Sequence, residues 1–277
     1  MSFLPPRGAA LVRALGAGSI FEVALVTLGG EEHICKRLRS RMLSEPVARS
    51  AMEREASVLR RVRHPSLPEL IDEGSDISGP YVVESCLRGA TLRELVDGWL
   101  ERGSPMPPRL LGHVVRASFA ALGEVHGLST EHGALELVHG DLGPDHVLLG
   151  QQGQIFFVDF GQARWRGMDP ALRGPDRGTL PFVAPELARG EVEPDQRADV
   201  FALAATLAFA ALGRDPCSAE TSAARLVEIS EQGVDLEVLR GCARLEPEQL
   251  HALLAALHFD PAERICRAVD VARLLVS

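Results

Sequence analysis

The feature that most constrains how this chain can fold is a pair of neighbouring segments near its middle. The first, from Leu137 to Leu149, reads LVHGDLGPDHVLL, and the second, from Ile155 to Gly161, reads IFFVDFG. Each combines a short apolar run with an aspartate, Asp141 in the first and Asp159 in the second. These are the most specific patterns in the chain, so the other motifs are interpreted by their order relative to them.

The composition indicates a globular protein without a nucleic-acid or membrane partner. Of the 277 residues 46% are hydrophobic, enough for one large domain or two small ones. The net charge is −9 and there is no long basic run, which argues against nucleic acid. The N-terminus does not resemble a signal peptide, and the longest apolar stretch, Val200 to Leu212, is too short to cross a bilayer.

The cysteines indicate a reducing compartment. Their number is odd and no two are closely spaced, which argues against a disulfide framework and against a zinc site. The five are Cys35, Cys86, Cys217, Cys242 and Cys266. We therefore expect a cytoplasmic protein.

The first third of the chain predicts strands followed by a helix. Val23–Leu28 and His33–Lys36 are separated by two glycines and predict a hairpin. Pro46–Arg63 predicts a helix that ends before Pro65, because a residue that precedes proline disfavours the helical conformation. The inward face of this helix is expected to consist of Val47, Ala51, Glu55, Leu59 and Val62.

Helical patterns dominate the remainder. Tyr81–Glu84 predicts a short strand, and Thr91 with Glu94 predicts a capping box at the start of a helix. Pro107–Gly127 predicts a long amphipathic helix. Its apolar stripe consists of Leu111, Val114, Val115, Phe119, Leu122 and Val125. Together with a buried helix at 200–212, these elements predict a small β-rich lobe, a connector near 84–89 and a larger α-rich lobe, with a ligand in the cleft between them.

Two features near the N-terminus could belong to a phosphate-binding site. Leu15 to Val23 reads LGAGSIFEV, and glycines allow a backbone to approach phosphates closely, although an ordinary hairpin turn explains the same pattern. Lys36 lies within the next apolar strand, where a charge needs a partner, and Glu55 on the following helix could supply it. Taken alone, residues such as Lys36 and Glu55 are more often solvated surface charges.

The central segments resemble the catalytic loop HRDLKPENILL and the Asp-Phe-Gly motif of protein kinases. Further matches occur in the same order, at His64-Pro65, at Gly178–Glu186 (GTLPFVAPE), at Asp199-Val200-Phe201 and at Asp260-Pro261 with Arg264. Over residues 10 to 276 the chain therefore resembles the eukaryotic-like (Hanks-type) protein kinases of bacteria, with a degenerate catalytic loop.

This resemblance implies an α+β, bilobal protein-kinase-like fold. Residues 1–9 would be an N-terminal extension, residues of about 10–85 the small β-rich lobe, and residues of about 90–276 the larger α-helical lobe. Glu186 and Arg264 would form a buried ion pair, and Asp199 would anchor the catalytic loop. Each of these three residues is structural, so their presence supports the fold more than activity.

The resemblance also implies a set of site residues. Lys36 would hold the α- and β-phosphates of ATP with Glu55 as its partner, Asp159 would bind Mg²⁺ or Mn²⁺, and Asp141 would accept the proton of the substrate hydroxyl. Thr179 would lie against Asp141. The residues expected around the nucleotide are Leu15, Val23 and Leu148 at the adenine, Gly16 and Gly18 at the phosphates, and the backbone of Glu84 and Cys86 at the adenine edge.

Two departures from the family pattern concern regulation. Gly140 replaces the arginine that normally meets a phosphate on the activation segment. Between Gly161 and Ala184 the only hydroxyl side chain is Thr179. We therefore expect that this segment is not switched by its own phosphorylation.

Other departures concern catalysis. Gly143 replaces a lysine that contacts the transferred phosphate, which should weaken transition-state stabilisation. His146 replaces a metal-binding asparagine, and it is either a ligand or a polar filler. Ile34 stands where a small residue is usual above the adenine, and Phe21 replaces the third glycine of the phosphate loop.

Three functions fit this set of residues. The first is an ATP- and Mg²⁺-dependent serine/threonine protein kinase with an unidentified protein substrate. The second is a pseudokinase that binds nucleotide or docks a regulatory partner, as Gly143, His146 and Ile34 would favour. The third is a small-molecule phosphotransferase of the aminoglycoside type, because HGDLGPDH also resembles that catalytic loop, although the Ala184-Pro185-Glu186 segment favours a protein kinase.

Overall fold

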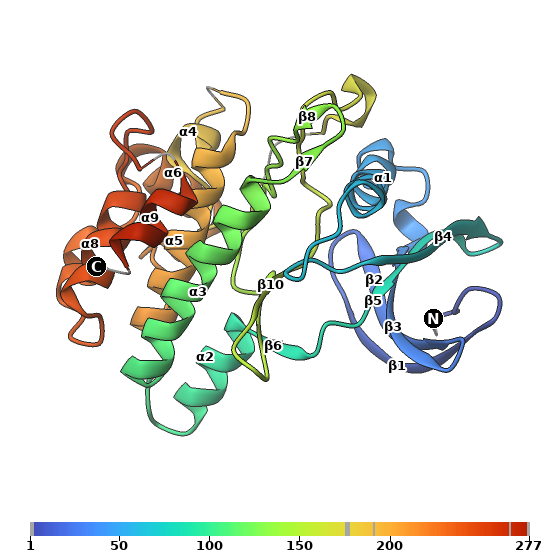
Figure 1. Ribbon diagram of the computed structural model, residues 1–277, viewed down its shortest axis with the longest axis horizontal. Coiled ribbons are helices and arrows are strands. Elements are labelled where there is room, and N and C mark those ends of the chain that lie inside the picture. The colour runs from blue at the N-terminus through green and yellow to red at the C-terminus, as the bar shows by residue number, and fades with distance from the viewer. Residues whose placement is uncertain (1–2, 175–177, 191, 266, 276–277) are drawn as a thin grey trace.

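In a computed structural model the chain forms two regions that differ in secondary structure (Figure 1). The structure describes residues 3–174, 178–190, 192–265 and 267–275, so Cys266 and the C-terminal limit predicted for the domain lie outside the described residues. The N-terminal region is built on a sheet, and the C-terminal region consists mainly of helices. This confirms the predicted α+β, bilobal architecture.

The N-terminal sheet has five antiparallel strands in the order β1-β2-β3-β5-β4. Their bounds are Ala9–Ala17 for β1, Phe21–Leu28 for β2, Glu31–Leu38 for β3, Leu70–Asp76 for β4 and Gly79–Ser85 for β5. The predicted hairpin is confirmed as β2 and β3, whose connecting residues Gly29 and Gly30 both have a positive φ. The strand predicted at Tyr81–Glu84 is the central part of β5.

Helix α1 (Pro46–Arg61) packs on this sheet and follows the short 3-10 helix η1 (Ser40–Met42). Its buried face includes Ala51, Glu55 and Leu59, as predicted. Val47 is a correction, because 44% of its surface is exposed. At about 100° per residue Val47 lies about 80° around the helix from Glu55, at the edge of the buried face.

The helical region is organised around α3 and α5. Its helices are α2 (Leu92–Glu101), α3 (Pro108–His126), α4 (Pro185–Ala188), α5 (Gln196–Leu212), α6 (Ser222–Gln232), α7 (Leu236–Arg240), α8 (Pro247–Ala256) and α9 (Ala268–Leu274). The predicted stripe of α3 is buried throughout, and α5 is buried on all sides from residue 198 to residue 211, as expected of a core helix. The capping box predicted for Thr91 and Glu94 is present at the start of α2.

Short strands and loops join the two regions and carry the central sequence segments. Strands β6 (Gly89–Thr91), β9 (Val147–Gly150) and β10 (Ile155–Phe157) form a small antiparallel sheet in the order β10-β9-β6. Two smaller strands, β7 (Ser129–Thr130) and β8 (Gly133–Ala134), pair nearby, and the 3-10 helix η2 (Pro170–Leu172) follows β10. The residues between Leu135 and Val147 connect β8 to β9.

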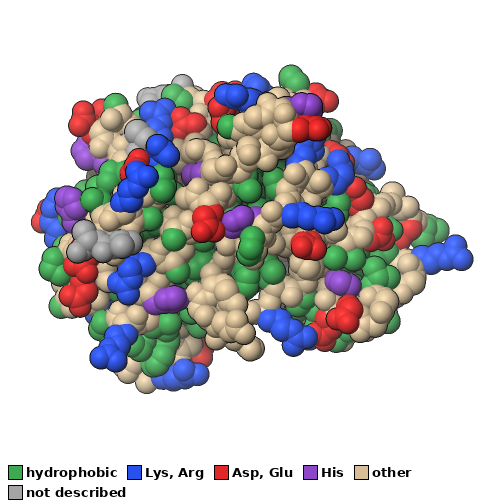
Figure 2. All heavy atoms as spheres, viewed as in Figure 1, with side chains coloured by type: hydrophobic (Ala, Val, Ile, Leu, Met, Phe, Trp, Pro, Cys, Tyr) green, Lys and Arg blue, Asp and Glu red, His purple; other side chains and the backbone are tan. Residues whose placement is uncertain are grey.

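Within the described parts of the chain, every helix is either too short or too polar to cross a lipid bilayer. On the face shown in Figure 2, acidic and basic side chains are interspersed over both regions. A buried ion pair between Glu186 and Arg264, with N–O distances of 2.6 and 3.0 Å, fixes α4 inside the helical region as predicted.

Candidate active site

A buried lysine is paired with two carboxylates beneath the N-terminal sheet. Lys36 lies on β3 and donates a hydrogen bond from Nζ to Oε1 of Glu55 on α1, as the sequence predicts. Its Nζ also lies 3.1 Å from Oε1 of Glu84 on β5. All three residues are less than 10% exposed. The site therefore holds one cation between two buried anions.

Glu84 occupies a different position from the one predicted. It lies inside β5, opposite Ile34 of β3 and Leu70 of β4, so its backbone is part of the sheet. Because residues that share a face alternate along a strand, Glu84 and Val82 point to the same side as Lys36, which pairs with Val82. The structure thus brings the side chain of Glu84, rather than its backbone, to the site. Cys86 lies just beyond β5, half-buried in the connector.

Burial and charge change the proton affinities in this cluster. Burial and the nearby Asp159 and Glu84 raise the pKa of Glu55 to about 8, against the opposing charge of Lys36. Burial lowers the pKa of Lys36, but Glu55 and Glu84 outweigh it and raise that pKa above its usual value. The Oε2 atoms of both glutamates are buried without a hydrogen-bond partner among the described residues. One lysine does not neutralise two carboxylates, so proton binding by Glu55 becomes more favourable than it is in water.

The catalytic-loop segment is anchored by Asp199 at the start of α5. Oδ2 of Asp199 accepts a hydrogen bond from the amide of His139 at 2.7 Å, and Oδ1 accepts one from the amide of Gly140 at 2.9 Å. Nε2 of His126 lies 3.0 Å from Oδ2. Asp199 is 1% exposed, which matches the anchoring role that the resemblance implies.

Asp141 and Thr179 lie together, as predicted. The amide of Thr179, not its hydroxyl, donates to Oδ1 of Asp141 at 2.7 Å. This contact fixes the carboxylate against the end of the activation segment. Gly143 lies close by, and a Cβ atom added there would make only ordinary contacts, 3.7 Å from Phe182 and 3.8 Å from Thr179. The backbone at Gly143 would therefore accommodate the Cβ of a larger residue, so steric crowding does not explain the absence of the lysine.

Asp159 and His146 form the candidate metal site. Nδ1–H of His146 donates to the carbonyl of Asp141 at 2.7 Å, and Nε2 lies 3.6 Å from Oδ2 of Asp159. Burial lowers the pKa of His146, but Asp159 and Asp141 outweigh it, so that the pKa is raised. Burial raises the pKa of Asp159, whereas Lys36 and His146 outweigh it and hold that pKa low.

These donors fit a divalent cation. An ionised carboxylate suits Mg²⁺ and Mn²⁺, which combine protein carboxylates with substrate phosphates, whereas an imidazole nitrogen suits softer divalent ions. About a third of the Asp159 side chain is exposed to solvent. Across the ranges that the structure describes, no three His, Cys, Asp or Glu side chains form a complete metal cage. Phosphate oxygens would therefore have to complete the coordination.

A cavity of about 260 Å³ joins these groups to the glycine segment. It is lined by Gly18, Ser19, Ile20, Phe21, Val23, Lys36, Ala51, Asp141, His146, Asp159, Gly161, Gln162 and Thr179. The lysine, both aspartates, His146 and Thr179, all predicted from the sequence, thus share one space. Phe21, the first residue of β2, also packs in a hydrophobic cluster with Ala51 and Met52 of α1.

The glycine segment is tied down by a residue that the sequence analysis did not single out. The amide of Arg39 donates to the carbonyl of Ile20 at 2.9 Å, and its Nη1 donates to the carbonyl of Gly18 at 2.8 Å. Gly16 and Leu15 lie on β1, where Gly16 pairs with Val23 of β2. Leu15 is 40% exposed, while Val23 and Leu148 are half-buried. The three residues predicted at the adenine thus keep accessible apolar surface.

Arg54 was not predicted as a site residue, and Glu84 was predicted only through its backbone, because the tertiary structure alone brings their side chains to the site. The buried guanidinium of Arg54 binds backbone carbonyls of the segment after Asp159. A charged residue within an apolar strand or on the inward face of a helix is the only sequence signal that could have pointed to either.

The fold and the site together define a protein kinase domain. Residues 10–271 match the protein kinase domain family, so the chain belongs to this family. It is 28% identical over 264 residues to the serine/threonine-protein kinase PknL of Mycobacterium tuberculosis, covering 89% of this chain and 62% of PknL.

Two other relatives are similar at the same level. The serine/threonine-protein kinase PknD of Mycobacterium tuberculosis is 31% identical over 271 residues, which cover 95% of this chain and 38% of PknD. The tyrosine-protein kinase MasK of Myxococcus xanthus is 31% identical over 266 residues, which cover 92% of this chain and 40% of MasK. The chain spans less than two thirds of the length of each of these relatives.

Proposed function

We propose that this domain is an ATP-dependent serine/threonine protein kinase that transfers a phosphoryl group to a hydroxyl of another protein. The observation that carries the proposal is the shared cavity, in which Lys36, Asp141 and Asp159 face one space of about 260 Å³. A kinase needs these three charges because the reaction depends on holding phosphates, holding a metal ion and orienting a hydroxyl.

Each residue has a task that follows from its position. Lys36 is charged and buried, so it can hold phosphate oxygens, and Glu55 keeps its Nζ directed at the cavity. Oδ1 of Asp141 is occupied by the Thr179 amide, which leaves Oδ2 to accept the proton of the substrate hydroxyl. Gly18 and its neighbours provide backbone amides at the same cavity, where anionic phosphates can approach.

Asp159 and His146 are the residues that would hold Mg²⁺ or Mn²⁺. Bound ATP supplies the phosphoryl group, and the cation offsets the negative charge of its phosphates. His146 also lies between the two aspartates, with Nδ1 held by the Asp141 carbonyl, and so separates two like charges. The low pKa of Asp159 keeps it ionised for this task at any physiological pH.

Serine and threonine are the proposed acceptors because of Thr179 and two of the relatives. Thr179 lies against Asp141, the position that the resemblance assigns to a threonine in serine/threonine kinases. PknL and PknD carry that specificity in their names, whereas MasK is named a tyrosine kinase. A mixture of peptides with serine, threonine or tyrosine as the sole hydroxyl would distinguish the two classes.

The first experiment is thermal melting with ATP, with and without Mg²⁺ or Mn²⁺. A ligand that binds only the folded protein raises the melting temperature. We expect a metal-dependent rise in the parent that is lost in Asp159→Ala and reduced in Lys36→Met. Phosphotransfer from radiolabelled ATP to the peptide mixture should follow the same pattern.

A second candidate, a pseudokinase, is favoured by one observation. The contact of Glu84 with Lys36 adds a carboxylate that competes with phosphate for the lysine, and Gly143 removes a second cation from the same region. A melting temperature that does not respond to ATP, or responds equally without metal, together with no phosphotransfer, would favour this alternative.

A further inference from the structure

A buried arginine connects α1 to the segment that follows Asp159. Arg54 directly precedes Glu55 on α1 and is 1% exposed. Its Nε donates to the carbonyl of Gly161 at 2.6 Å, and its Nη1 donates to the carbonyl of Leu172 at 2.5 Å. Charge-assisted hydrogen bonds of this kind are among the stronger polar contacts, and here they join residues more than 100 positions apart in the sequence.

A second arginine holds the same segment from the side of the catalytic loop. The backbone of Arg164 exchanges two hydrogen bonds with Val138, at 2.8 and 2.9 Å. Its Nη2 donates to the carbonyl of Gly174 at 2.9 Å. Arg54 of α1 therefore holds the carbonyls of residues 161 and 172 from outside the segment, and Arg164, which is itself part of the segment, holds the carbonyl of residue 174.

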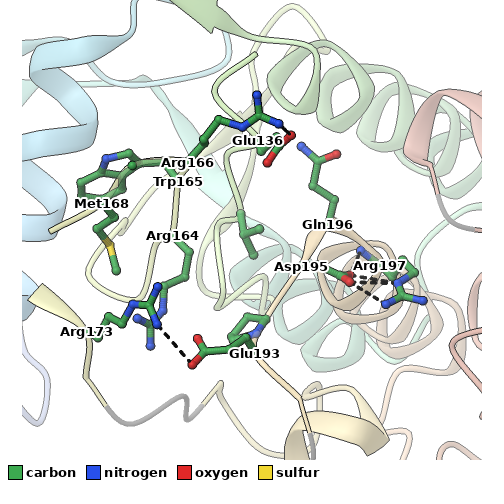
Figure 3. A pocket seen from close by; sticks show the side chains of 13 residues that line it. Glu136, Arg164, Trp165, Arg166, Met168, Arg173, Glu193, Asp195, Gln196 and Arg197 are labelled. Atoms are coloured by element: carbon green, nitrogen blue, oxygen red, sulfur yellow. Dashed lines mark hydrogen bonds and ion pairs between the residues drawn. The ribbon is translucent and has the colours of Figure 1, made fainter. Parts of the chain in front are cut away.

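Among the residues that the structure describes, three other arginines near the segment have carboxylate partners. Arg164 lines a pocket of about 630 Å³ (Figure 3). In the same pocket Arg166 pairs with Glu136, Arg173 pairs with Glu193 at 3.6 Å, and Arg197 pairs with Asp195 at 2.7 Å. These cations are matched by anions of the chain itself, so the pocket does not require an added phosphate for charge balance.

The segment also has little capacity for a phosphate of its own. Thr179 is its only hydroxyl residue, and the amide of Thr179 is already bound to Asp141. At Gly140, where the family pattern has arginine, φ is +81° and an added Cβ would lie 2.5 Å from the Gln162 carbonyl oxygen. The backbone at this position therefore disfavours any side chain that could meet a phosphate.

We propose that Arg54 is a positioning residue that orders the activation segment in place of phosphorylation. Because Arg54 and Glu55 are adjacent on α1, the contact that places Glu55 beside Lys36 and the contact that orders residues 161–174 form or break together. The catalytic consequence rests on the proposed kinase function, but the ordering of the segment does not. The unphosphorylated protein is then already in its working conformation.

Amide hydrogen exchange without nucleotide tests this proposal directly. The amides of Leu172 and Arg173 are bonded within η2 and report the order of the segment. We expect Arg54→Ala to speed their exchange by about tenfold or more, while the amides of α5 keep their protection. Arg49→Ala is the matched control, since Arg49 is an exposed arginine of α1 whose Nε donates to the nearby Leu43 carbonyl.

Gly174→Val tests the contact without changing the arginine. A Cβ at residue 174 would lie 2.9 Å from Nη1 of Arg54, the movable end of a flexible side chain, so it would displace the guanidinium while the fold is kept. We expect the same faster exchange at Leu172 and Arg173. If Arg54→Ala fails to fold, this variant alone decides the question.

The proposal is overturned if exchange at these amides is unchanged in Gly174→Val, or if Arg49→Ala raises it as much as Arg54→Ala. It is also overturned if the parent transfers phosphate only after phosphorylation of Thr179, as mass spectrometry and phosphatase treatment would reveal. A parent that transfers no phosphate refutes the proposed kinase function instead, and the exchange result still decides whether Arg54 orders the segment.

Discussion

Glu84 brings a second buried carboxylate to Lys36, and this single residue changes the electrostatics of the site. Its Oε1 lies 3.1 Å from the lysine, while Glu55 binds the same ammonium group. Burial, together with the negative charges of Asp159 and Glu84, favours uptake of a proton by Glu55 and raises its pKa to about 8. The Lys36–Glu55 pair could be predicted from the sequence. The contact of the Glu84 side chain with Lys36 could not, because the face of the sheet on which that side chain lies depends on how β5 pairs with β3.

The first prediction concerns this proton. A pKa that is raised on folding, from 4.5 to about 8, adds stability that is complete below pH 4.5 and is lost as the pH rises through about 8. His146 contributes with the same sign, because its pKa is also raised. In Glu84→Gln the like charge is removed, so the free energy of unfolding should fall less steeply between pH 5 and pH 8. Urea denaturation at several pH values measures this slope.

Glu69→Gln serves as the control for that experiment. Glu69 is exposed and lies just before β4, so its removal should leave the slope unchanged. An unaltered slope in Glu84→Gln would mean that Glu84 does not set the proton affinity of Glu55.

At the scale of elements, the catalytic loop is shaped by a helix that is distant in sequence. Asp199 of α5 binds two consecutive amides of the loop, and Gly140 supplies a positive φ between His139 and Asp141. The sequence predicted α5, α3 and the hairpin of β2 and β3 well, because apolar periodicity and paired glycines are local signals. It predicted Val47 incorrectly, because the edge of a buried face depends on what packs against the helix.

The second prediction concerns this loop. Gly140→Ala should lower the free energy of unfolding by about 2 kcal/mol, because a side chain at positive φ is strained and its Cβ would meet the Gln162 carbonyl oxygen at 2.5 Å. Gly143→Ala in the same loop is the matched control, since its Cβ would have no neighbour closer than 3.7 Å. Equal midpoints of urea denaturation for the two variants would contradict the strained geometry.

At the scale of the whole molecule, a residue that lies before the first strand completes the hydrophobic core on one face of the N-terminal sheet. Phe3 is 7% exposed and packs with Ala24, Val26, Cys35 and Val83 on the side of the sheet away from α1. The resemblance implies that residues 1–9 are an N-terminal extension. Within that range, Phe3 belongs to the core of the small lobe.

The third prediction follows from that packing. Phe3→Ala should lower the free energy of unfolding by about 2–4 kcal/mol, because it leaves a cavity beneath the sheet. Leu4→Ala is the neighbouring control and should change it by less than about 0.5 kcal/mol, because Leu4 is 57% exposed. A Phe3→Ala protein that melts like the Leu4→Ala protein would show that the segment adds nothing to the lobe.

The sequence by itself determined the family, the order of the elements and most of the residues that line the cavity. Short sequence motifs contain four of the charged or polar residues of the cavity, Lys36, Asp141, His146 and Asp159. These motifs are recognisable in the sequence, so it could be predicted without coordinates that the four residues lie together. Local signals, such as glycine pairs, capping residues and apolar stripes, can likewise be recognised in a single sequence.

Only the tertiary structure decided the contacts between distant side chains. Arg54 reaches Gly161 and Leu172, and Glu84 reaches Lys36, because strand register and helix packing bring them together. A buried charge can be paired by any opposite group that the fold brings within a few ångströms, and one sequence leaves that choice open. The raised pKa of Glu55 and the contacts of Arg54 with the activation segment are consequences of packing, not of any motif.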